Sequence, residues 1–303
     1  MVNKVTVLGS LNVDTILKIN RLPKPGETMQ MNSKQNAGGG KGANQAIAAA
    51  RCGAKTSFIG KIGNDANGAM MLELLKEAEI DTDAITYSAS GTGQAFILLQ
   101  ESGENSILVY GGANQELSLE DIDQAQAKIA ASDFLITQFE TPLAGGEYAF
   151  ELAKKAGVKT ILNPAPAKQV PPEMLSLTDL ITPNETEAQA LTGIAVKDEV
   201  SCQQAAKKLQ ALGVKNVIIT LGSKGAFYQT KTTHGFVPAF KVQAVDTTAA
   251  GDTFLGSLSS QLDTDFTNIE AAIRFANKAS SLAVQKLGAI PSIPTYAEIS
   301  ANN

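Results

Sequence analysis

The chain has 303 residues, enough for one α/β domain with an appendage or for two smaller domains. Its formal charge is −5, from 25 basic and 30 acidic residues, and the Lys and Arg residues are scattered, which argues against a nucleic-acid partner. The two cysteines indicate neither a disulfide framework nor a zinc site, and any histidine-dependent chemistry would rest on His234, the only histidine.

Short apolar segments alternate with amphipathic ones along most of the chain. Strands are predicted at residues 5–8, 56–62, 134–137, 160–162, 180–182 and 216–221, and helices at 42–51, 67–78, 118–129, 145–156, 185–192 and 201–212. This alternation predicts a three-layer α/β/α sandwich with a mostly parallel central sheet. The first ten residues lack a signal-like apolar segment and no run reaches the length of a membrane span, so we expect a cytoplasmic protein without membrane contact.

Two stretches, 12–36 and 93–110, break this alternation. They carry strand-like segments at 15–19, 94–100 and 106–110, joined by turn residues such as Pro25 and Gly103, with no helix between them. We therefore expect a small antiparallel β lid inserted into a single α/β domain that spans 1–303, because no linker marks a second domain.

Asn12 and Asp14 follow the first predicted strand. In a parallel sheet this is the edge where ligands bind, and two residues that are two positions apart can point to the same side. A carboxylate and an amide so placed can hold adjacent hydroxyl groups of a sugar. The alternative is a simple cap or turn.

Residues 38–44, Gly-Gly-Gly-Lys-Gly-Ala-Asn, lead directly into a helix. They do not form a Walker A loop, which needs Ser or Thr after Gly-Lys, and they lie too far past the first strand for a dinucleotide fingerprint. Two interpretations are left. The glycines allow the backbone to approach a small polar ligand, with Lys41 and Asn44 as donors, or the segment is an ordinary loop.

Two further strand ends carry polar residues. Asn184 and Glu187 could organise a phosphate and a hydrated Mg²⁺, or they could form a capping box for the helix that begins there. The turn from Thr220 to Gly225 could hold nucleotide phosphates on its amides, although a plain hairpin turn would have the same sequence.

The segment 246–252, Asp-Thr-Thr-Ala-Ala-Gly-Asp, runs into an apolar periodic stretch that ends at Leu262. A helix that starts here presents free amides and its positive dipole end, and Ala249, Ala250 and Gly251 have no side chain to block an anion. Asp252 would then lie beside a bound phosphate, where it is poorly placed for binding and well placed to accept a proton. The alternative is that Asp252 only complements the helix dipole.

The glycine-rich stretch with its helix, together with 246–252 and the following Thr253 and Phe254, resembles the two signatures of the ribokinase family of carbohydrate kinases. The resemblance covers essentially the whole chain. The positions that hold the sugar in that family coincide with Asn12, Asp14, residues 40–44 and Glu140 of this chain. The segment Asn-Pro-Ala-Pro-Ala at 163–167 is typical of the branch of the family that acts on ribose.

The resemblance implies ATP-dependent phosphorylation of D-ribose at O5, with Asp252 as the base and the amides of residues 249–252 as the anion hole. The implied ribose-binding residues are Asn12, Asp14, Gly40, Lys41, Asn44, Glu140 and Asp252, and the implied ATP-binding residues are Asn184, Thr220, Gly222, Ser223, Gly225, Gly251 and Asn277. Glu187 would help to place Mg²⁺ through water. A monovalent cation, K⁺, would be held largely by backbone carbonyls at Asp246, Thr248, Ala283, Lys286, Gly288 and Ser292. A homodimer formed through the lid is also implied.

Two alternatives stay open. A sibling kinase of the same fold could act on fructose, fructose 1-phosphate, a nucleoside or another pentose. The absence of Trp and the 5% aromatic content favour a bare sugar over a nucleoside. A sugar sensor without catalysis is disfavoured by the intact segment 246–252.

Overall fold

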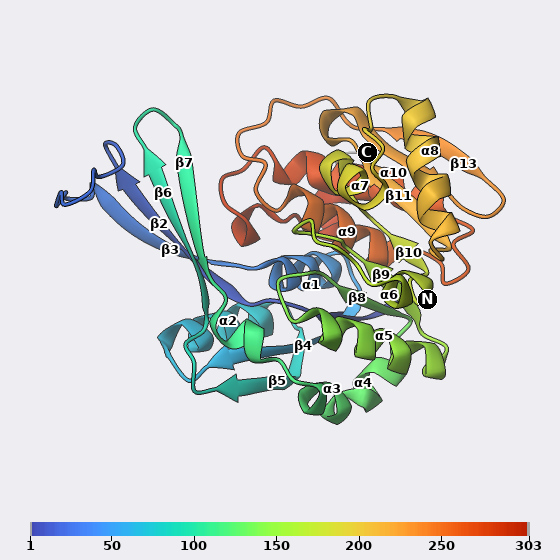
Figure 1. Ribbon diagram of the computed structural model, residues 1–303, viewed down its shortest axis with the longest axis horizontal. Coiled ribbons are helices and arrows are strands. Elements are labelled where there is room, and N and C mark those ends of the chain that lie inside the picture. The colour runs from blue at the N-terminus through green and yellow to red at the C-terminus, as the bar shows by residue number, and fades with distance from the viewer. Residues whose placement is uncertain (1, 302–303) are drawn as a thin grey trace.

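The structure is a computed structural model that describes residues 2–301 (Figure 1). Within those residues the chain forms a nine-stranded sheet between two layers of helices and a four-stranded sheet that projects from this body. In spatial order the large sheet contains β13 (His234–Pro238), β12 (Gly225–Gln229), β11 (Asn216–Thr220), β10 (Leu180–Ile181), β9 (Lys159–Leu162), β8 (Phe134–Thr137), β1 (Lys4–Leu8), β4 (Lys55–Gly63) and β5 (Asp81–Ser88).

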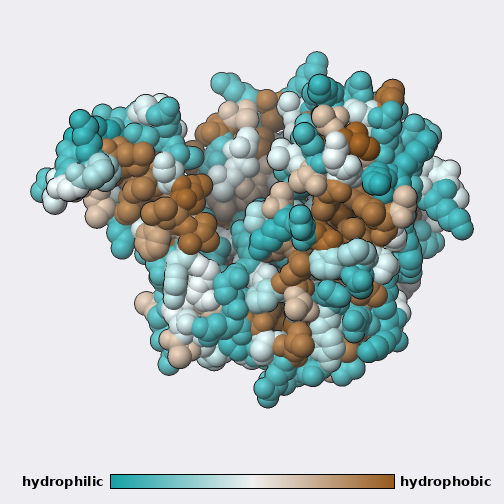
Figure 2. Space-filling view, viewed as in Figure 1, coloured by the Kyte–Doolittle hydropathy of each residue, from teal (hydrophilic) through white to brown (hydrophobic). Residues whose placement is uncertain are grey.

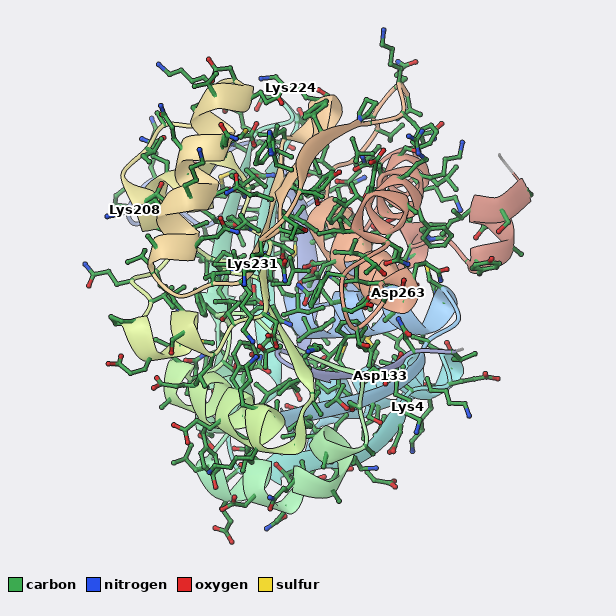
Figure 3. The ribbon with its side chains drawn as sticks, turned by 90° about the vertical axis from the view of Figure 1, so that its right-hand side faces the viewer. Lys4, Asp133, Lys208, Lys224, Lys231 and Asp263 are labelled. Carbon is green, nitrogen blue, oxygen red and sulfur yellow. The ribbon has the colours of Figure 1, made fainter. Side chains whose placement is uncertain are left out.

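The large sheet is parallel from β11 to β5, and β12 runs antiparallel to both of its neighbours, β11 and β13. The predicted three-layer sandwich is therefore confirmed. Strand β1 lies between β8 and β4, so the residues that follow it emerge near the middle of the sheet's carboxyl edge. At the opposite edge the Lys4 amide donates to Asp133 Oδ2 (2.8 Å), and Figure 3 shows these two labelled residues side by side.

The helices form two layers. One layer contains α1 (Lys41–Arg51), α2 (Ala66–Glu77), α9 (Ala250–Gln261), α10 (Ile269–Ala283) and α11 (Tyr296–Ala301). The other contains α3 (Leu119–Gln124), α4 (Gln126–Ala130), α5 (Leu143–Ala156), α6 (Pro172–Ser176), α7 (Glu185–Thr192) and α8 (Glu199–Ala211). Three short 3₁₀ turns are named η1 (Gly112–Glu116), η2 (Gly222–Lys224) and η3 (Ile290–Ser292).

Each face of the sheet has its own hydrophobic core. Ile136 and Ile218 belong to the core under α1 and α9, whereas their strand neighbours Leu135 and Ile219 belong to the core under α5 and α8. Successive side chains of a strand point to opposite faces, so strands that are apolar throughout are covered on both sides. This explains why the predicted strands read as continuous apolar runs.

The small sheet, called the lid, has the order β3 (Ser33–Gly39), β2 (Asn12–Ile19), β6 (Gly93–Gln100) and β7 (Asn105–Tyr110). The pairs β2–β3 and β6–β7 are antiparallel, in agreement with the predicted antiparallel lid, but the two pairs join through a parallel pair, β2–β6. Figure 1 shows the lid extending away from the body at the upper left. The sequence analysis had not predicted β3, which extends through Gly38 and Gly39 up to the start of α1.

Two other predictions need correction. The helix predicted at 118–129 is two short helices, because the Ala125 amide donates to the Ile122 carbonyl (3.1 Å) in a tight turn that ends the first one. The strand predicted at 180–182 has only two residues. Strand β5 was missed because it is a polar edge strand without an apolar run. No helix within residues 2–301 combines the length and the apolar character that crossing a bilayer requires.

Helices α1 and α9 are in direct backbone contact. A Cβ atom added at Gly256 would lie 2.3 Å from the Gln45 carbonyl oxygen and 2.5 Å from the Ala48 Cβ. The alanine-rich face of α1 and this glycine let the two helix axes approach closely. As a result, the first turn of α1 lies against the first turn of α9.

We predict that Gly256→Ala lowers the free energy of unfolding by about 1–3 kcal/mol, because the added methyl group has no space between two backbones. Gly145→Ala in α5 is the matched control. Its Cβ would meet only the end of the Ile122 side chain at 3.1 Å, so the gain in helix propensity should leave stability unchanged or slightly higher. Urea unfolding of both variants tests this, and equal stability of the two would contradict it.

Candidate active site

A cavity of about 810 Å³ opens at the carboxyl edge of the large sheet. Its walls come from the start of α1, the segments after β9 and β10, the turn η2, the segment 239–252 and one face of α10. Among the predicted site residues it brings together Lys41, Asn184, Thr220, Gly251, Asp252 and Asn277. The predicted residues Asn12, Asp14, Asn44 and Glu140 do not line this cavity. They lie where β1, the lid and α1 meet.

The start of α9 has the features that an anion site requires. Ala249 has a left-handed backbone (φ 58°) and no side chain caps the helix. Within residues 2–301 the amides of Gly251 and Asp252 donate to no acceptor, whereas the Ala250 amide bonds the Thr247 carbonyl (3.2 Å). A Cβ added at Gly251 would meet nothing within 4 Å. Two free N–H groups and the positive end of the helix dipole therefore face an open space.

Asp252 lies in the first turn of α9 and is 7% exposed. Asn44 Nδ2 donates to its Oδ2 (3.1 Å) and Gln45 Nε2 donates to its Oδ1 (2.8 Å). Burial raises the pKa of this carboxyl above its ordinary value, and the charge of Lys41 and the two amide hydrogen bonds oppose that rise. The result is a desolvated carboxylate that is held in one orientation.

Lys41, the first residue of α1, lies among three carboxylates. The charge of Asp252 is the main cause that raises the pKa of Lys41, and Glu140 and Glu187 add to it against the effect of burial. Lys41 therefore stays charged and balances part of the negative charge around the cavity.

Asn12 and Asp14 both lie on β2, two positions apart, so they share a face of the strand as predicted. Burial raises the pKa of Asp14 to about 6, and the nearby charge of Glu140 adds to the rise. Glu140 is itself fixed, because its Oε2 accepts from the Lys41 amide (3.0 Å) and from the Ser10 hydroxyl. These side chains form a polar group at the base of the lid.

Asn114 holds Asn12, and the sequence analysis did not find it. Its Nδ2 donates to Asn12 Oδ1 (2.7 Å) and to the Leu11 carbonyl (3.1 Å), and its Oδ1 accepts from the Leu11 amide (2.9 Å). The Asn12 oxygen is thereby occupied, which leaves its NH₂ group to face a ligand.

The glycines around the start of α1 are explained in part by packing of the chain against itself. Gly40 has φ +92°, and a Cβ at Gly42 would lie 2.6 Å from the Ser10 amide nitrogen. A Cβ at Gly39 would lie 2.4 Å from Asp14 Oδ2. The sequence leaves open whether the glycine run admits a ligand or is an ordinary loop. At these positions its role is to let the start of α1 press against the segment that carries Asn12 and Asp14.

In the part of the cavity near α7, the capping box is present. Asn184 Oδ1 accepts from the Glu187 amide (2.8 Å), and Glu187 Oε2 accepts from the Asn184 amide (3.0 Å). Burial raises the pKa of Glu187. The turn residues Gly222, Ser223 and Gly225 also line the cavity. Asn277 donates to the carbonyls of Val237 (3.1 Å) and Pro238 (3.2 Å), so its amide ties α10 to β13.

The residues that the resemblance implied for a monovalent cation lie on two joined segments. Asp246 Oδ1 accepts from the Thr248 amide (2.9 Å), and its Oδ2 accepts from the Gly288 amide (2.9 Å). The Asp246 amide bonds the Val284 carbonyl (3.1 Å), which places Ala283, Lys286 and Gly288 beside 246–248, with Ser292 on the η3 turn that follows. In the described part of the chain no three His, Cys, Asp or Glu side chains cluster as metal ligands, so a cation here would depend on carbonyl oxygens.

The chain is similar to known carbohydrate kinases over nearly its whole length. The profile of the pfkB family carbohydrate kinases matches residues 2–296. A ribokinase of Staphylococcus aureus (strain COL) is 50% identical over 301 residues, 99% of either chain. The solved structure of Arabidopsis thaliana ribokinase complexed with ribose and ATP aligns with a TM-score of 0.92 at 35% identity, over 99% of this chain and 98% of that one.

A longer relative also matches. The bifunctional ribokinase/ribose-5-phosphate isomerase A of Fructilactobacillus sanfranciscensis is 51% identical over 294 residues, 96% of this chain. The chain spans 54% of that relative's length.

We predict that a ¹³C titration of the side-chain carboxyls, assigned with Asp14→Asn, gives Asp14 a pKa of about 6. Glu140→Gln removes a like charge, so the Asp14 pKa should fall while staying above the model-peptide value, because burial is the larger cause. The control is Glu73→Gln, at an exposed position of α2, which should leave the Asp14 pKa unchanged. An Asp14 pKa at or below about 4 would contradict the burial argument.

Proposed function

This chain belongs to the pfkB family of carbohydrate kinases, and we propose that it transfers the γ-phosphoryl group of ATP to O5 of D-ribose, giving D-ribose 5-phosphate and ADP. The observation that carries the proposal is the buried Asp252 carboxylate in the first turn of a helix that no side chain caps and whose Gly251 and Asp252 amides are free in the described residues. The similarity to ribokinases over nearly the whole chain supports the same conclusion. A cytoplasmic location, where ATP is available, is part of the proposal.

Asp252 acts as the general base. Its carboxylate accepts the proton of the O5 hydroxyl as O5 forms a bond to the γ-phosphorus and the bond between that phosphorus and the leaving oxygen of ADP breaks. Its raised pKa suits this role, since a base works best when its pKa lies near the working pH.

The free amides of Gly251 and Asp252 receive the transferred phosphoryl group. Charge accumulates on its oxygens in the transition state, and N–H groups that are already oriented stabilise it without reorganisation. The sequence analysis assigned this role to residues 249–252. The Ala250 amide already has a carbonyl partner, so Ala249, Gly251 and Asp252, whose amides have none in the described residues, are the stronger candidates. Lys41 adds a positive charge beside them.

Ribose is held by the polar group at the base of the lid. Asn12, Asp14, Asn44 and Glu140 offer amide donors and carboxylate acceptors for vicinal hydroxyls. ATP occupies the cavity from the η2 turn to α10, against Thr220, Ser223 and Asn277. Mg²⁺ bound with ATP would neutralise phosphate charge. Glu187 would hold this Mg²⁺ through a water molecule, because the capping box engages only one of its carboxylate oxygens, Oε2.

We predict that Asp252→Asn retains ribose binding, measured by calorimetry, and lowers kcat by about 10²–10⁴-fold. The amide keeps the size of the side chain but cannot accept the proton. Asp198→Asn, which keeps a capping residue at the exposed start of α8, should leave kcat unchanged. A loss of less than about threefold in Asp252→Asn would remove this residue from the role of base.

The substrate itself is tested by ADP release in the presence of ATP, Mg²⁺ and K⁺ with a panel of sugars and nucleosides. We expect the highest kcat/KM with D-ribose. A higher value with fructose, fructose 1-phosphate, 2-deoxyribose or a nucleoside would identify a sibling kinase. Binding of a sugar without any ADP release would identify a sensor.

We also propose activation by a monovalent cation, K⁺, bound between 246–248 and the segment after α10. A cation there would lie next to the start of α9 and support its geometry. We predict that Asp246→Ala, which frees the Gly288 amide, raises the KCl concentration for half-maximal activity by about tenfold at constant ionic strength. Asp265→Ala is the control, because Asp265 bonds Thr267 in the same local pattern far from Gly288. Activity that does not depend on KCl would refute the proposal.

A homodimer through the lid is proposed from its exposed apolar surface. On β7, Ile107, Leu108 and Val109 are 54%, 62% and 69% exposed, and Figure 2 shows hydrophobic side chains gathered on the lid. Strands β3 and β7 also leave unpaired edges. We predict that Val109→Asp shifts a dimer to a monomer in sedimentation velocity, whereas Val200→Asp, at an equally exposed position of α8, does not. A monomeric wild-type protein at micromolar concentration would contradict the proposal.

A further inference from the structure

Two glutamine side chains form a hydrogen-bonded chain that ends on the proposed base, and a side branch of this chain reaches Asn163. Gln138 Nε2 donates to Gln45 Oε1 (2.6 Å), and Gln45 Nε2 donates to Asp252 Oδ1 (2.8 Å) and to Asn163 Oδ1 (3.1 Å). Gln45 is fully buried and Gln138 is 2% exposed. We propose that Gln45 is a positioning residue that holds Asp252 ionised and oriented for proton transfer. The inference deepens the proposed function and rests on Asp252 being the base.

The hydrogen bonds fix which end of the Gln45 amide faces Asp252. Its oxygen accepts from Gln138, and both hydrogens of its nitrogen have acceptors, one on Asp252 and one on Asn163. A carboxylate can only accept, so a turned amide would put two oxygens against each other. Gln138 therefore acts on Asp252 only through Gln45, because its hydrogen bond keeps the Gln45 oxygen turned away from the base.

Gln45 does not line the cavity, so it reaches a ligand there only through Asp252 and through Asn163, which does line the cavity. Asn44 is different, since it borders the polar group at the base of the lid and its buried Oδ1 has no protein partner. In the described chain Gln45 is the one donor to Asp252 Oδ1 and Asn44 the one donor to Oδ2, and each oxygen keeps a second lone pair for the sugar hydroxyl.

The electrostatics explain why the base needs this donor. The charged groups that face Asp252 are Lys41 from α1, Glu140 after β8 and Glu187 from α7. Helix α10, which packs against α9, contributes the neutral Ser280, whose hydroxyl donates to the Ala250 carbonyl (2.9 Å). Burial and Glu140 favour the protonated form of Asp252, and a hydrogen bond from Gln45 favours the ionised form.

The test is Gln45→Met, which keeps the length of the side chain and removes its donor. A hydrogen bond to a charged group is worth roughly the equivalent of one pH unit or more, so the acid limb of the kcat profile should move up by about one unit. We expect kcat on the acid limb to fall by up to about tenfold and the KM values for ribose and ATP to change by less than about twofold. The loss should shrink as the pH rises, because a higher pH restores the carboxylate.

Two further variants separate positioning from folding. Gln138→Met leaves the bond between Gln45 and Asp252 possible but frees the Gln45 amide to turn, so it should give a smaller shift in the same direction. Gln229→Met is the matched control, since Gln229 is a buried glutamine that donates to another glutamine, Gln210 (2.6 Å), away from the cavity. It should lower stability without moving the acid limb.

A second measurement distinguishes a failure of the proposed function from a failure of the role proposed for Gln45. A ¹³C titration of the Asp252 carboxyl, assigned with Asp252→Asn, should show its pKa rising in Gln45→Met whether or not ribose is turned over. If wild-type protein fails to phosphorylate ribose while this rise is observed, the function is wrong and the role of Gln45 stands. If the carboxyl pKa and the acid limb stay unchanged in Gln45→Met, or if Gln229→Met moves them equally, the inference is wrong.

Discussion

The close contact between α1 and α9 is the constraint on which the rest of the site depends. Gly256 lets the backbone of α9 touch the Gln45 carbonyl, and this brings Asn44 and Gln45 onto Asp252 across separations of 208 and 207 residues. The glycines before α1 serve the same purpose on its other side, where they let the chain press against Ser10. Small residues therefore position the chemistry, because only they allow polar side chains from distant segments to meet at such short range.

The same arrangement accounts for the charge of the site. A buried carboxylate is costly unless it is paired or hydrogen-bonded. Asp252 receives two amide hydrogen bonds and the charge of Lys41, which offset part of this cost without neutralising the carboxylate. The remaining rise in its pKa is useful to a base, and the free amides beside it are useful to a developing phosphoryl charge. The burial of Asp252, its proposed role as proton acceptor and the proposed anion site thus all follow from one helix start.

The features that depend on local sequence patterns could be predicted from the sequence. The parallel sheet follows from apolar runs that alternate with amphipathic helices, and the helix starts at Asn184 and near Ala250 follow from their polar or small residues. Sequence reasoning did not find Gln45 or Asn114, whose partners lie far away in the sequence. Neighbouring residues of a helix normally point in different directions, so the pair Asn44 and Gln45 gave no sign that both contact one carboxylate. Strand β3 was missed because its glycines do not favour a strand, and pairing with β2 overrides that tendency.

We propose that Asp252, held in place by α1, faces the hydroxyl that is phosphorylated. The most direct measurement is a crystal structure with D-ribose and a non-hydrolysable ATP analogue bound. We expect one Asp252 carboxylate oxygen within about 2.6–3.2 Å of ribose O5, with the γ-phosphate analogue on the Gly251 and Asp252 amides. A closed complex in which that carboxylate lies more than about 5 Å from O5, with no bridging water, would contradict the account.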